Sequence, residues 1–227
     1  MKNKDKDLVL KIENVSYRYS DALEGEYVFK DLNYEFYNGN VYAIKGKSGS
    51  GKTTLLSLLS GLENNYEGSI TFNGRELRDI DLDNYRSRDI GIVFQSYNLL
   101  PHLTAIENIV LSMNVSNLAI DNKTERALEL MKSVGLETSQ KDRRVLKLSG
   151  GEQQRVAIAR SLSYNPKIIL ADEPTGNLDK ETENDILKIL KDLAKNDNKC
   201  IIIVTHSENV CNQADVVYEL KKRRKVK

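Results

Sequence analysis

Two short segments in the C-terminal third of the chain are entirely apolar. Residues 168–171 read IILA, and residues 201–204 read IIIV. Runs of this length without alternation are typical of strands buried on both faces of a parallel sheet. Between them, residues 180–194 carry apolar side chains at helical spacing. This order of strand, helix and strand predicts an α/β core.

The N-terminal part of the chain has a looser pattern, in which apolar and polar residues alternate. Residues 8–19 alternate in this way and are predicted to form an edge strand. A turn is expected at Asn38-Gly39-Asn40, with a strand on either side of it. We therefore expect an antiparallel β patch ahead of the core. The further strands predicted in this part are residues 32–37, 41–45, 69–72 and 90–94.

Helical spacing dominates from Thr104 to about Tyr164. Thr104 and Glu107 are three residues apart, which is the spacing of a capping box at a helix start. Residues 123–134 form an amphipathic pattern that should end at Gly135. The predicted fold class is thus α/β, with an N-terminal antiparallel patch and an α-helical insertion.

Composition limits the kinds of protein that the chain can be. It has 227 residues, three prolines and a net charge of +1, and it shows no linker or repeat. We therefore expect one domain over residues 1–227 and no nucleic-acid partner. No apolar run reaches membrane-spanning length, and the N-terminus lacks the apolar core of a signal peptide, so a cytoplasmic location is expected. Cys200 and Cys211 are interpreted as buried or incidental thiols, without a metal.

A glycine-rich loop follows the strand predicted at residues 41–45. The loop reads GKSGSGKT from Gly46 to Thr53, and a leucine-rich helix comes next. This is the phosphate-loop motif in its expected context, where backbone N–H groups converge on phosphate oxygens. Lys52 adds charge for the β- and γ-phosphates, and the Thr53 hydroxyl can ligate Mg²⁺. No N-K-x-D tetrapeptide follows, which makes a GTPase less favoured. The predicted nucleotide-binding residues here are Gly46, Ser48, Gly49, Ser50, Gly51, Lys52, Thr53 and Thr54.

A second glycine turn opens a helix at Leu148, where the chain reads LSGGEQQR. A serine hydroxyl and glycine N–H groups at a helix N-terminus form another potential anion site. Together with the phosphate loop, this motif resembles the signature of the ABC ATPase family, and the resemblance covers nearly the whole chain. It implies a phosphate-loop cassette with a mixed RecA-like core and an α-helical subdomain at about residues 97–165.

The same resemblance implies a homodimer that forms head to tail on ATP binding. In such a dimer, the signature of one chain completes the ATP site of the other, and a C2 arrangement gives two such sites. The signature residues predicted to bind nucleotide are Ser149, Gly150, Gly151 and Glu152.

The apolar strand at residues 168–171 is followed by two carboxylates. Side chains at the carboxyl end of a strand face the ligand crevice of an open α/β sheet. The resemblance implies that Asp172 anchors Mg²⁺ and that Glu173 is the general base for the attacking water. Asp179, in the following sequence PTGNLD, resembles the family residue that binds nucleotide across the dimer.

Two further residues match the family's sensors of the γ-phosphate. Gln95 follows a predicted strand, and the resemblance implies contact with Mg²⁺ or the attacking water. His206 ends the strand at residues 201–204 and resembles the switch histidine, which holds the water and Glu173 in line. The other histidine, His102, is expected at the surface.

Adenine is expected to stack on an aromatic ring near the end of the first strand. Alignment of the segment NVSYRY with the family pattern favours Tyr19. Tyr17 is two residues away and would share the same face of a strand, so it stays an alternative.

The motifs around Gln95 and Asp179 resemble one branch of the family most closely. That branch serves macrolide exporters, lipoprotein-release complexes and antimicrobial-peptide resistance systems, so the implied role is export of, or resistance to, a peptide, lipid or drug-like substrate. An integral membrane permease is the implied partner, contacted through residues 96–103, with the chain peripheral on the inner face of the membrane. The alternatives are an ABC ATPase of repair or translation, whose coiled coils or second cassette are missing here, and a regulatory module without hydrolysis, which should lack Glu173 or His206. The basic residues 221–227 are expected to be a solvated tail, with lipid contact as the alternative.

Overall fold

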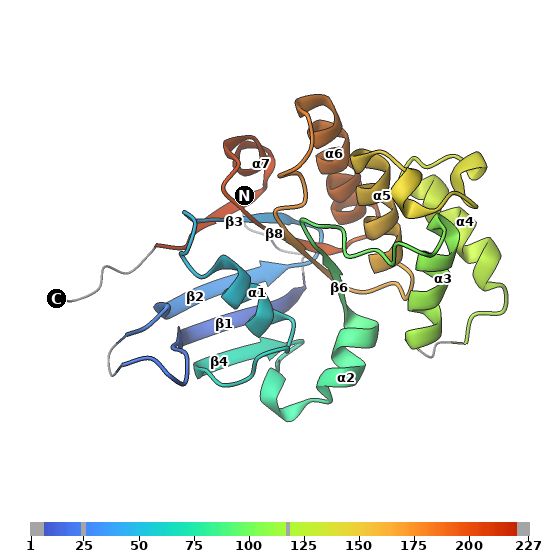
Figure 1. Ribbon diagram of the computed structural model, residues 1–227. Helices are drawn as coiled ribbons and strands as arrows, with labels where there is room; N and C mark the ends of the chain where they lie inside the picture. The colour runs from blue at the N-terminus through green and yellow to red at the C-terminus, as the bar shows by residue number, and fades with distance from the viewer. Residues whose placement is uncertain (1–6, 24–25, 117–118, 222–227) are drawn as a thin grey trace.

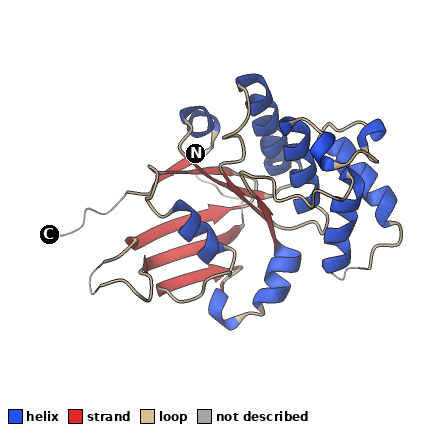
Figure 2. Cartoon of the chain, viewed as in Figure 1, coloured by secondary structure: helices blue, strands red, loops and turns tan. Residues whose placement is uncertain are grey.

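The computed structural model describes residues 7–23, 26–116 and 119–221. Two sheets and a group of helices make up the architecture (Figures 1 and 2). One sheet has the strand order β2-β1-β4-β5, and its pairs are antiparallel. Its strands are β1 (Leu8–Tyr17), β2 (Phe29–Tyr37), β4 (Glu67–Phe72) and β5 (Arg75–Glu76).

The second sheet has the order β6-β7-β8-β3-β9, and its pairs are parallel. Its strands are β3 (Val41–Lys45), β6 (Ile90–Val93), β7 (Ile168–Asp172), β8 (Cys200–Thr205) and β9 (Val216–Glu219). The predicted α/β fold with an antiparallel patch is confirmed, and its mixed character lies in two separate sheets.

The helices are α1 (Lys52–Leu59), α2 (Leu82–Asn84), α3 (Ala105–Val115), α4 (Lys123–Ser133), α5 (Gly150–Ser161), α6 (Lys180–Asn196) and α7 (Glu208–Gln213). Of these, α3 to α6 lie together at the right of Figure 1. Short helical turns occur at η1 (Leu77–Asp79), η2 (Tyr85–Asp89), η3 (Thr138–Gln140) and η4 (Val145–Lys147). Among the described residues, no helix is long and apolar enough to cross a membrane.

Strand β8 separates two hydrophobic cores. Ile202 and Val204 pack into the core that contains α1 and the antiparallel sheet. Ile201 and Ile203 pack into the core that contains α3 to α6. Successive side chains of a strand point to opposite faces, so an unbroken apolar run supplies both cores at once. The predicted burial of this strand on both faces is confirmed, as are its parallel partners.

The capping box predicted at Thr104 begins α3 as expected. The Thr104 hydroxyl accepts from the Glu107 N–H at 3.3 Å, and the Glu107 carboxylate accepts from the Thr104 N–H at 2.8 Å. Helix α4 ends at Ser133, and Gly135 has a φ of 75°, which suits a glycine at a helix end. The start of α3 and the end of α4 are therefore fixed by local chemistry that the sequence displays.

One prediction in the N-terminal part was wrong. Strand β1 is not an edge strand, because it pairs with β2 on one side and with β4 on the other. The predicted turn is present, with β2 and β3 on either side of it. The two strands belong to different sheets, and Gly39 N–H donates to the Lys199 carbonyl at 3.0 Å. The alternation of apolar and polar residues indicates which face of a strand is buried. It does not indicate which strands pair with its two edges, because those strands come from distant parts of the sequence. Of the basic run, residues 222–227 lie outside the described residues.

Candidate nucleotide-binding site

The phosphate loop connects β3 to α1, and Lys52 is the first residue of that helix. The Lys52 ammonium group folds back over the loop and donates to the Gly46 carbonyl at 2.9 Å. Gly51 has a φ of 93°, and a Cβ there would lie 2.5 Å from a Val28 methyl group. Only glycine suits this position, because the left-handed backbone and the close contact both exclude a side chain. The Ser50 hydroxyl is buried with no hydrogen-bond partner in the described part of the chain.

Thr53 and Asp172 face each other beside the loop. The Thr53 hydroxyl donates to Asp172 Oδ2 at 3.4 Å. Burial and the adjacent Glu173 carboxylate raise the pKa of Asp172, while the Thr53 hydrogen bond and Lys52 oppose that rise. No group of three or more His, Cys, Asp or Glu side chains among the described residues is arranged to hold a metal ion. The arrangement fits Mg²⁺, which keeps several waters and binds through one or two carboxylates together with substrate phosphates.

Both the backbone and the side chain of Glu173 are held in place by hydrogen bonds. Its φ is 45°, and its N–H donates to the Val204 carbonyl at 3.0 Å. One carboxylate oxygen lies 2.7 Å from His206 Nδ1 and 3.7 Å from Lys52 Nζ. The other accepts from the Thr205 hydroxyl at 3.1 Å. The side chain of Glu173 is 11% exposed, whereas that of His206 is 69% exposed. A buried carboxylate thus meets a solvent-facing imidazole beside the phosphate loop.

The signature residues begin α5. Ser149 caps the helix: its hydroxyl accepts from the Glu152 N–H at 3.3 Å, and its N–H donates to the Glu152 carboxylate at 2.6 Å. Gln140 also donates to Glu152. In Figure 1, α5 lies among the helices on the right, apart from α1. None of the hydrogen bonds among the described residues joins Ser149, Gly150 or Glu152 to the phosphate loop.

Gln95 and the segment before Asp179 lie together. The Asn177 side chain donates to the Gln95 carbonyl at 3.3 Å, and a Cβ on Gly176 would lie 3.0 Å from Gln95 Nε2. Asp179 caps α6 by accepting from the N–H groups of Glu181 and Thr182, each at 3.0 Å. These bonds lower its pKa, first among them the one from Thr182. Within the part of the chain that the structure describes, no hydrogen bond joins Gln95 to Thr53 or Asp172.

The two candidate tyrosines have different environments. Tyr17 is 5% exposed, and its hydroxyl donates to Glu63 at 3.3 Å. Tyr19 lies beyond the end of β1 and is 50% exposed, with its hydroxyl 2.8 Å from that of Thr54. The two rings meet edge to face, with centroids 5.3 Å apart. The residues therefore do not share one strand face, and Tyr19 alone offers an exposed ring beside the phosphate-loop helix.

Two residues at the site were not singled out from the sequence. Thr205 binds Glu173 through its hydroxyl, and its signal was a polar residue at the end of an apolar strand, directly before His206. Arg160 donates to the carbonyls of Tyr97 at 2.9 Å and Asn98 at 2.5 Å, which follow Gln95. Arg160 lies in an ordinary amphipathic helix, so its sequence position does not predict this contact.

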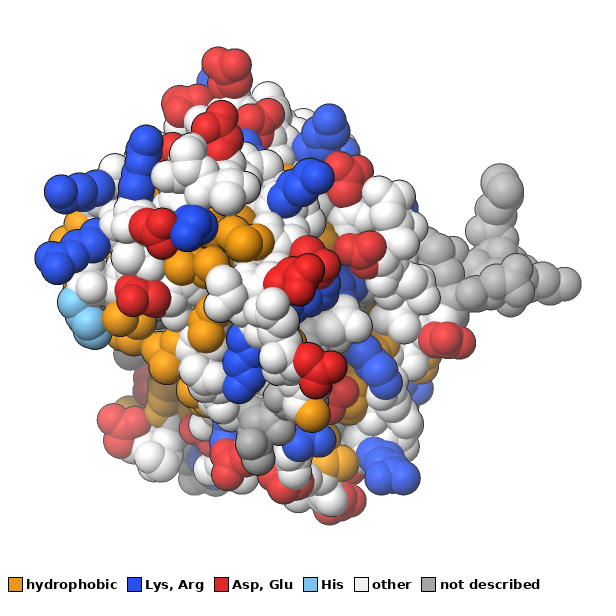
Figure 3. Space-filling view, turned by 90° about the vertical axis from the view of Figure 1, so that its right-hand side faces the viewer, with side chains coloured by type: hydrophobic (Ala, Val, Ile, Leu, Met, Phe, Trp, Pro, Cys, Tyr) orange, Lys and Arg blue, Asp and Glu red, His pale blue; other side chains and the backbone are white. Residues whose placement is uncertain are grey.

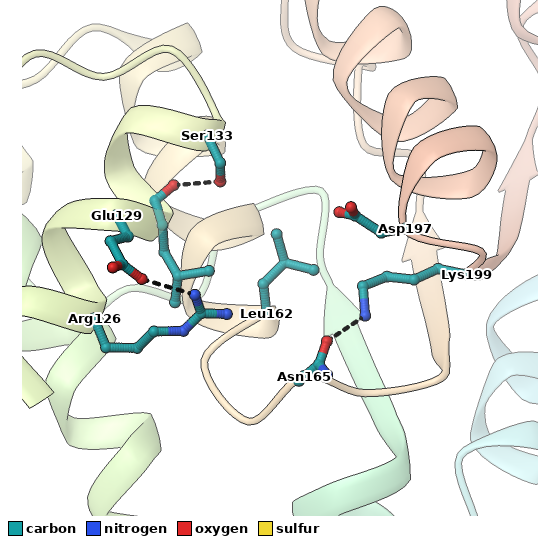
Figure 4. Close-up of a pocket in the computed structure, with 8 residues that line it drawn as sticks. Arg126, Glu129, Ser133, Leu162, Asn165, Asp197 and Lys199 are labelled. Carbon is teal, nitrogen blue, oxygen red and sulfur yellow. Dashed lines mark hydrogen bonds and ion pairs between the residues drawn. The ribbon is translucent and has the colours of Figure 1, made fainter. Parts of the chain in front are cut away.

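A cavity of about 390 Å³ lies away from the predicted site, between α4 and the turn after α6 (Figure 4). Arg126 pairs with Glu129 at 2.9 Å, and Lys199 donates to Asn165 at 2.8 Å. Burial lowers the pKa of Lys199. None of the predicted nucleotide-binding or catalytic residues lines this cavity.

Comparisons with known proteins show which family the chain is similar to. The family model described as ABC transporter matches residues 29–176. An uncharacterized ABC transporter ATP-binding protein of Bacillus subtilis, YclH, is 41% identical over 94% of each chain. The lipoprotein-releasing system ATP-binding protein LolD of Treponema denticola is 39% identical over 96% of each chain. Among solved structures, the ATP-binding cassette MJ0796 of Methanocaldococcus jannaschii, a dimer in a post-hydrolysis state bound to ADP and Pi, matches with a TM-score of 0.84, 38% identity and coverage of 95% and 97%.

The sequence similarity spans almost the full length of the chain, and it includes the phosphate loop and the carboxylate pair within the matched region. The chain therefore belongs to the ABC transporter family, of which it is an ATP-binding subunit.

Proposed function

We propose that the chain is a Mg²⁺-dependent ATPase that dimerises head to tail on binding ATP and drives a separate membrane permease. The observation that carries this proposal is the convergence of Lys52, Thr53, Asp172, Glu173 and His206 at the carboxyl ends of β3, β7 and β8. A phosphate cradle, a place for a cation and a candidate base lie there within a few ångströms of one another.

Each side chain has a separate part in binding. The N–H groups of the loop and the Lys52 ammonium group would hold the phosphates, and Lys52 is already oriented by the Gly46 carbonyl. Thr53 and Asp172 would hold Mg²⁺, and Gln95 is expected to reach it once nucleotide is bound. Bound Mg²⁺ supplies positive charge that neutralises the charge developing on the phosphate oxygens.

Hydrolysis is assigned to Glu173 together with His206. Glu173 would orient the attacking water and take up its proton, since its carboxylate is fixed by Thr205 and its backbone by β8. His206 would donate to the γ-phosphate from its solvent-facing ring while its Nδ1 stays with Glu173. The hydrogen bond between them would align the base with the phosphate. Holding reacting groups in the correct geometry in this way contributes to the rate of the reaction.

The head-to-tail dimer follows from the separation of the two anion sites. No hydrogen bond among the described residues joins Ser149 to the phosphate loop, yet both present N–H groups and a helix N-terminus. In a C2 dimer, Ser149 of one chain can face Lys52 of the other, which closes two equal sites. The relative MJ0796 has been solved as a dimer, which supports this arrangement.

The permease contact is assigned to the surface around Tyr97 and Leu100. Figure 3 looks onto the helical side and shows hydrophobic side chains gathered among charged ones. The helical subdomain has large hydrophobic residues with substantial exposure: Leu100 at 38%, Leu111 at 38%, Val115 at 72% and Leu146 at 71%. Exposed apolar groups of this kind often mark a protein interface. A permease contact here would place the chain at the inner face of the membrane.

Pull-down from the organism's own membranes tests this function. The wild-type chain should recover a multi-span permease, whereas the double variant Tyr97→Ala with Leu100→Ala should lose it while keeping its basal ATPase activity. Tyr97→Ala leaves the carbonyl that Arg160 holds, so the loop backbone keeps its clamp. The double variant Leu62→Ala with Leu23→Ala removes two apolar side chains elsewhere that are even more exposed than Leu100, and it serves as the control. Equal recovery of the permease by both double variants would contradict the assigned surface, and recovery of nucleic acid in place of a permease would contradict the function.

Tyr19→Ala should raise the dissociation constant for ATP by about tenfold, because stacking of a base on an aromatic ring is worth about 1–3 kcal/mol. Tyr19→Phe should change it little, since the ring supplies the contact and the hydroxyl only meets Thr54 at an exposed position. Titration with a fluorescent ATP analogue measures both. Tyr17→Phe removes the bond to Glu63 and leaves the buried ring, and it should bind normally. Unchanged affinity in Tyr19→Ala would rule out Tyr19 as the adenine contact.

A further inference from the structure

Glu183 joins the two segments that follow the proposed catalytic residues. Its Oε1 accepts from the Thr175 hydroxyl at 3.1 Å and from the Ser207 hydroxyl at 3.0 Å. Thr175 lies two residues after Glu173, and Ser207 directly follows His206. We propose that Glu183 is a positioning residue that holds Glu173 and His206 in their relative places. The inference rests on the catalytic roles proposed above for those two residues.

The two hydrogen bonds accepted by Glu183 form a brace between Thr175 and Ser207, and the two segments need such support. Glu173 has a φ of 45°, a conformation that a residue other than glycine adopts only when its surroundings enforce it. His206 has a side chain that is 69% exposed, so little packing around the ring fixes its position. Beside their mutual hydrogen bond and the bond from Thr205, the placement of the two residues depends on the backbone next to each of them, and Glu183 binds next to both.

Helix α6 makes Glu183 a firm point of attachment. Glu183 lies in the first turn of this helix, where its N–H donates to the carbonyl of the capping residue Asp179 at 2.8 Å. Further along the helix, Ile186, Leu187 and Leu190 are buried in the core. An acidic side chain in the first turn of a helix is also favoured by the positive end of the helix dipole. The brace thus connects two active-site loops to a rigid element.

The contacts extend toward the reacting groups on the β8 side. Ser207 N–H donates to the Thr205 hydroxyl oxygen at 2.9 Å, and that hydroxyl donates to Glu173 at 3.1 Å. Glu183 thus reaches Glu173 by two routes: through Thr175 along the chain and through Ser207 and Thr205 by hydrogen bonds. The hydrogen bonds of the Glu183 carboxylate go to Thr175 and Ser207 and not to Glu173 or His206, which distinguishes a positioning residue from a catalytic one.

The role depends on hydrogen bonding and not on charge. Both hydroxyl groups donate to a single oxygen, and the amide oxygen of glutamine can also accept two hydrogen bonds. Glu183→Gln should therefore keep kcat within about twofold of the wild type. Glu183→Ala should lower kcat by about tenfold, because misplacement of about 1 Å costs up to about 10²-fold in rate. The dissociation constant for ATP should stay the same in both.

Steady-state ATPase assays and nucleotide titration of the full chain provide the test. Glu181→Ala is the matched control, since it removes an exposed acid from the same helical turn, and only its backbone N–H contacts the Asp179 cap. It should behave as the wild type. If Glu183→Ala fails to fold, the double variant Thr175→Val with Ser207→Ala removes the same two hydrogen bonds and should give the same loss of kcat.

The His206 imidazole gives a second readout that mere loss of stability would not change. The chain has only two histidines, so the His206 NMR signal can be assigned with a His102→Gln variant. In Glu183→Ala this signal should shift, and in Glu183→Gln it should stay in place. Full activity and an unshifted signal in Glu183→Ala, beside an inactive Glu173→Gln, would overturn the role of Glu183 alone. An active Glu173→Gln would instead overturn the proposed catalytic assignment.

Discussion

Replacement of Glu173 by glutamine should lower ATP turnover by about 10²-fold or more, as expected when a general base is lost. The change keeps the size of the side chain and the hydrogen bond from Thr205, so the site should stay assembled. Binding of Mg·ATP should persist, because the negative charge that is lost lies 3.7 Å from Lys52 and does not itself attract phosphate. Phosphate release measures the turnover, and nucleotide titration measures the binding.

The same variant should also accumulate as a dimer when ATP is present. If hydrolysis separates the two chains, a chain that binds ATP without cleaving it should remain paired, and size exclusion would resolve the two species. Glu208→Gln makes the same change in an exposed residue that pairs with Lys45, and it should hydrolyse ATP normally. Turnover near the wild-type rate in Glu173→Gln would remove Glu173 from the role of base.

The parts of the fold that the sequence predicts well are those set by local pattern. The unbroken apolar run of β8 indicates burial on both faces, and the structure distributes Ile201 and Ile202 to different cores. Thr104 and Glu107 begin α3 through a capping box, which the sequence predicts because a threonine and a glutamate stand three residues apart. In these cases the interactions that decide the structure lie within a few residues of one another.

The parts that the sequence does not predict depend on distant partners. Alternation in β1 reports that one face is buried, yet the neighbours of that strand come from residues 29–37 and 67–72. Arg160 has no feature that distinguishes it from a surface arginine until the fold brings it to the carbonyls of Tyr97 and Asn98.

The site shows the same division. The motif spacing predicts which side chains stand at the ends of β3, β7 and β8, and the structure brings Lys52, Asp172 and Glu173 together there. The hydroxyl group that binds the Glu173 carboxylate belongs to Thr205, which lies 32 positions further along the chain. A single residue of this kind is not part of a sequence motif, so its contact with the site can be identified only in the folded structure.

Ser149→Arg should abolish ATP hydrolysis without weakening nucleotide binding to the isolated chain. The proposed target of Ser149 is the γ-phosphate held by the partner subunit, and a bulky side chain at that point would keep the two chains from closing. The loss of the Ser149 cap should cost about 1 kcal/mol of stability, which a thermal melt can check. Ser139→Arg adds the same charge at an exposed serine between α4 and α5 and should retain activity.

Mixing Ser149→Arg with Lys52→Ala distinguishes a shared site from a site within one chain. Each variant alone should inactivate both ATP sites of its homodimer. In a heterodimer, the intact Lys52 of the first chain meets the intact Ser149 of the second, so one of the two sites is restored. Random pairing should recover up to about a quarter of wild-type turnover if the sites act independently, since about half of the dimers are mixed and each has one good site. A mixture as inactive as its components, together with impaired nucleotide binding by isolated Ser149→Arg, would place Ser149 in the site of its own chain.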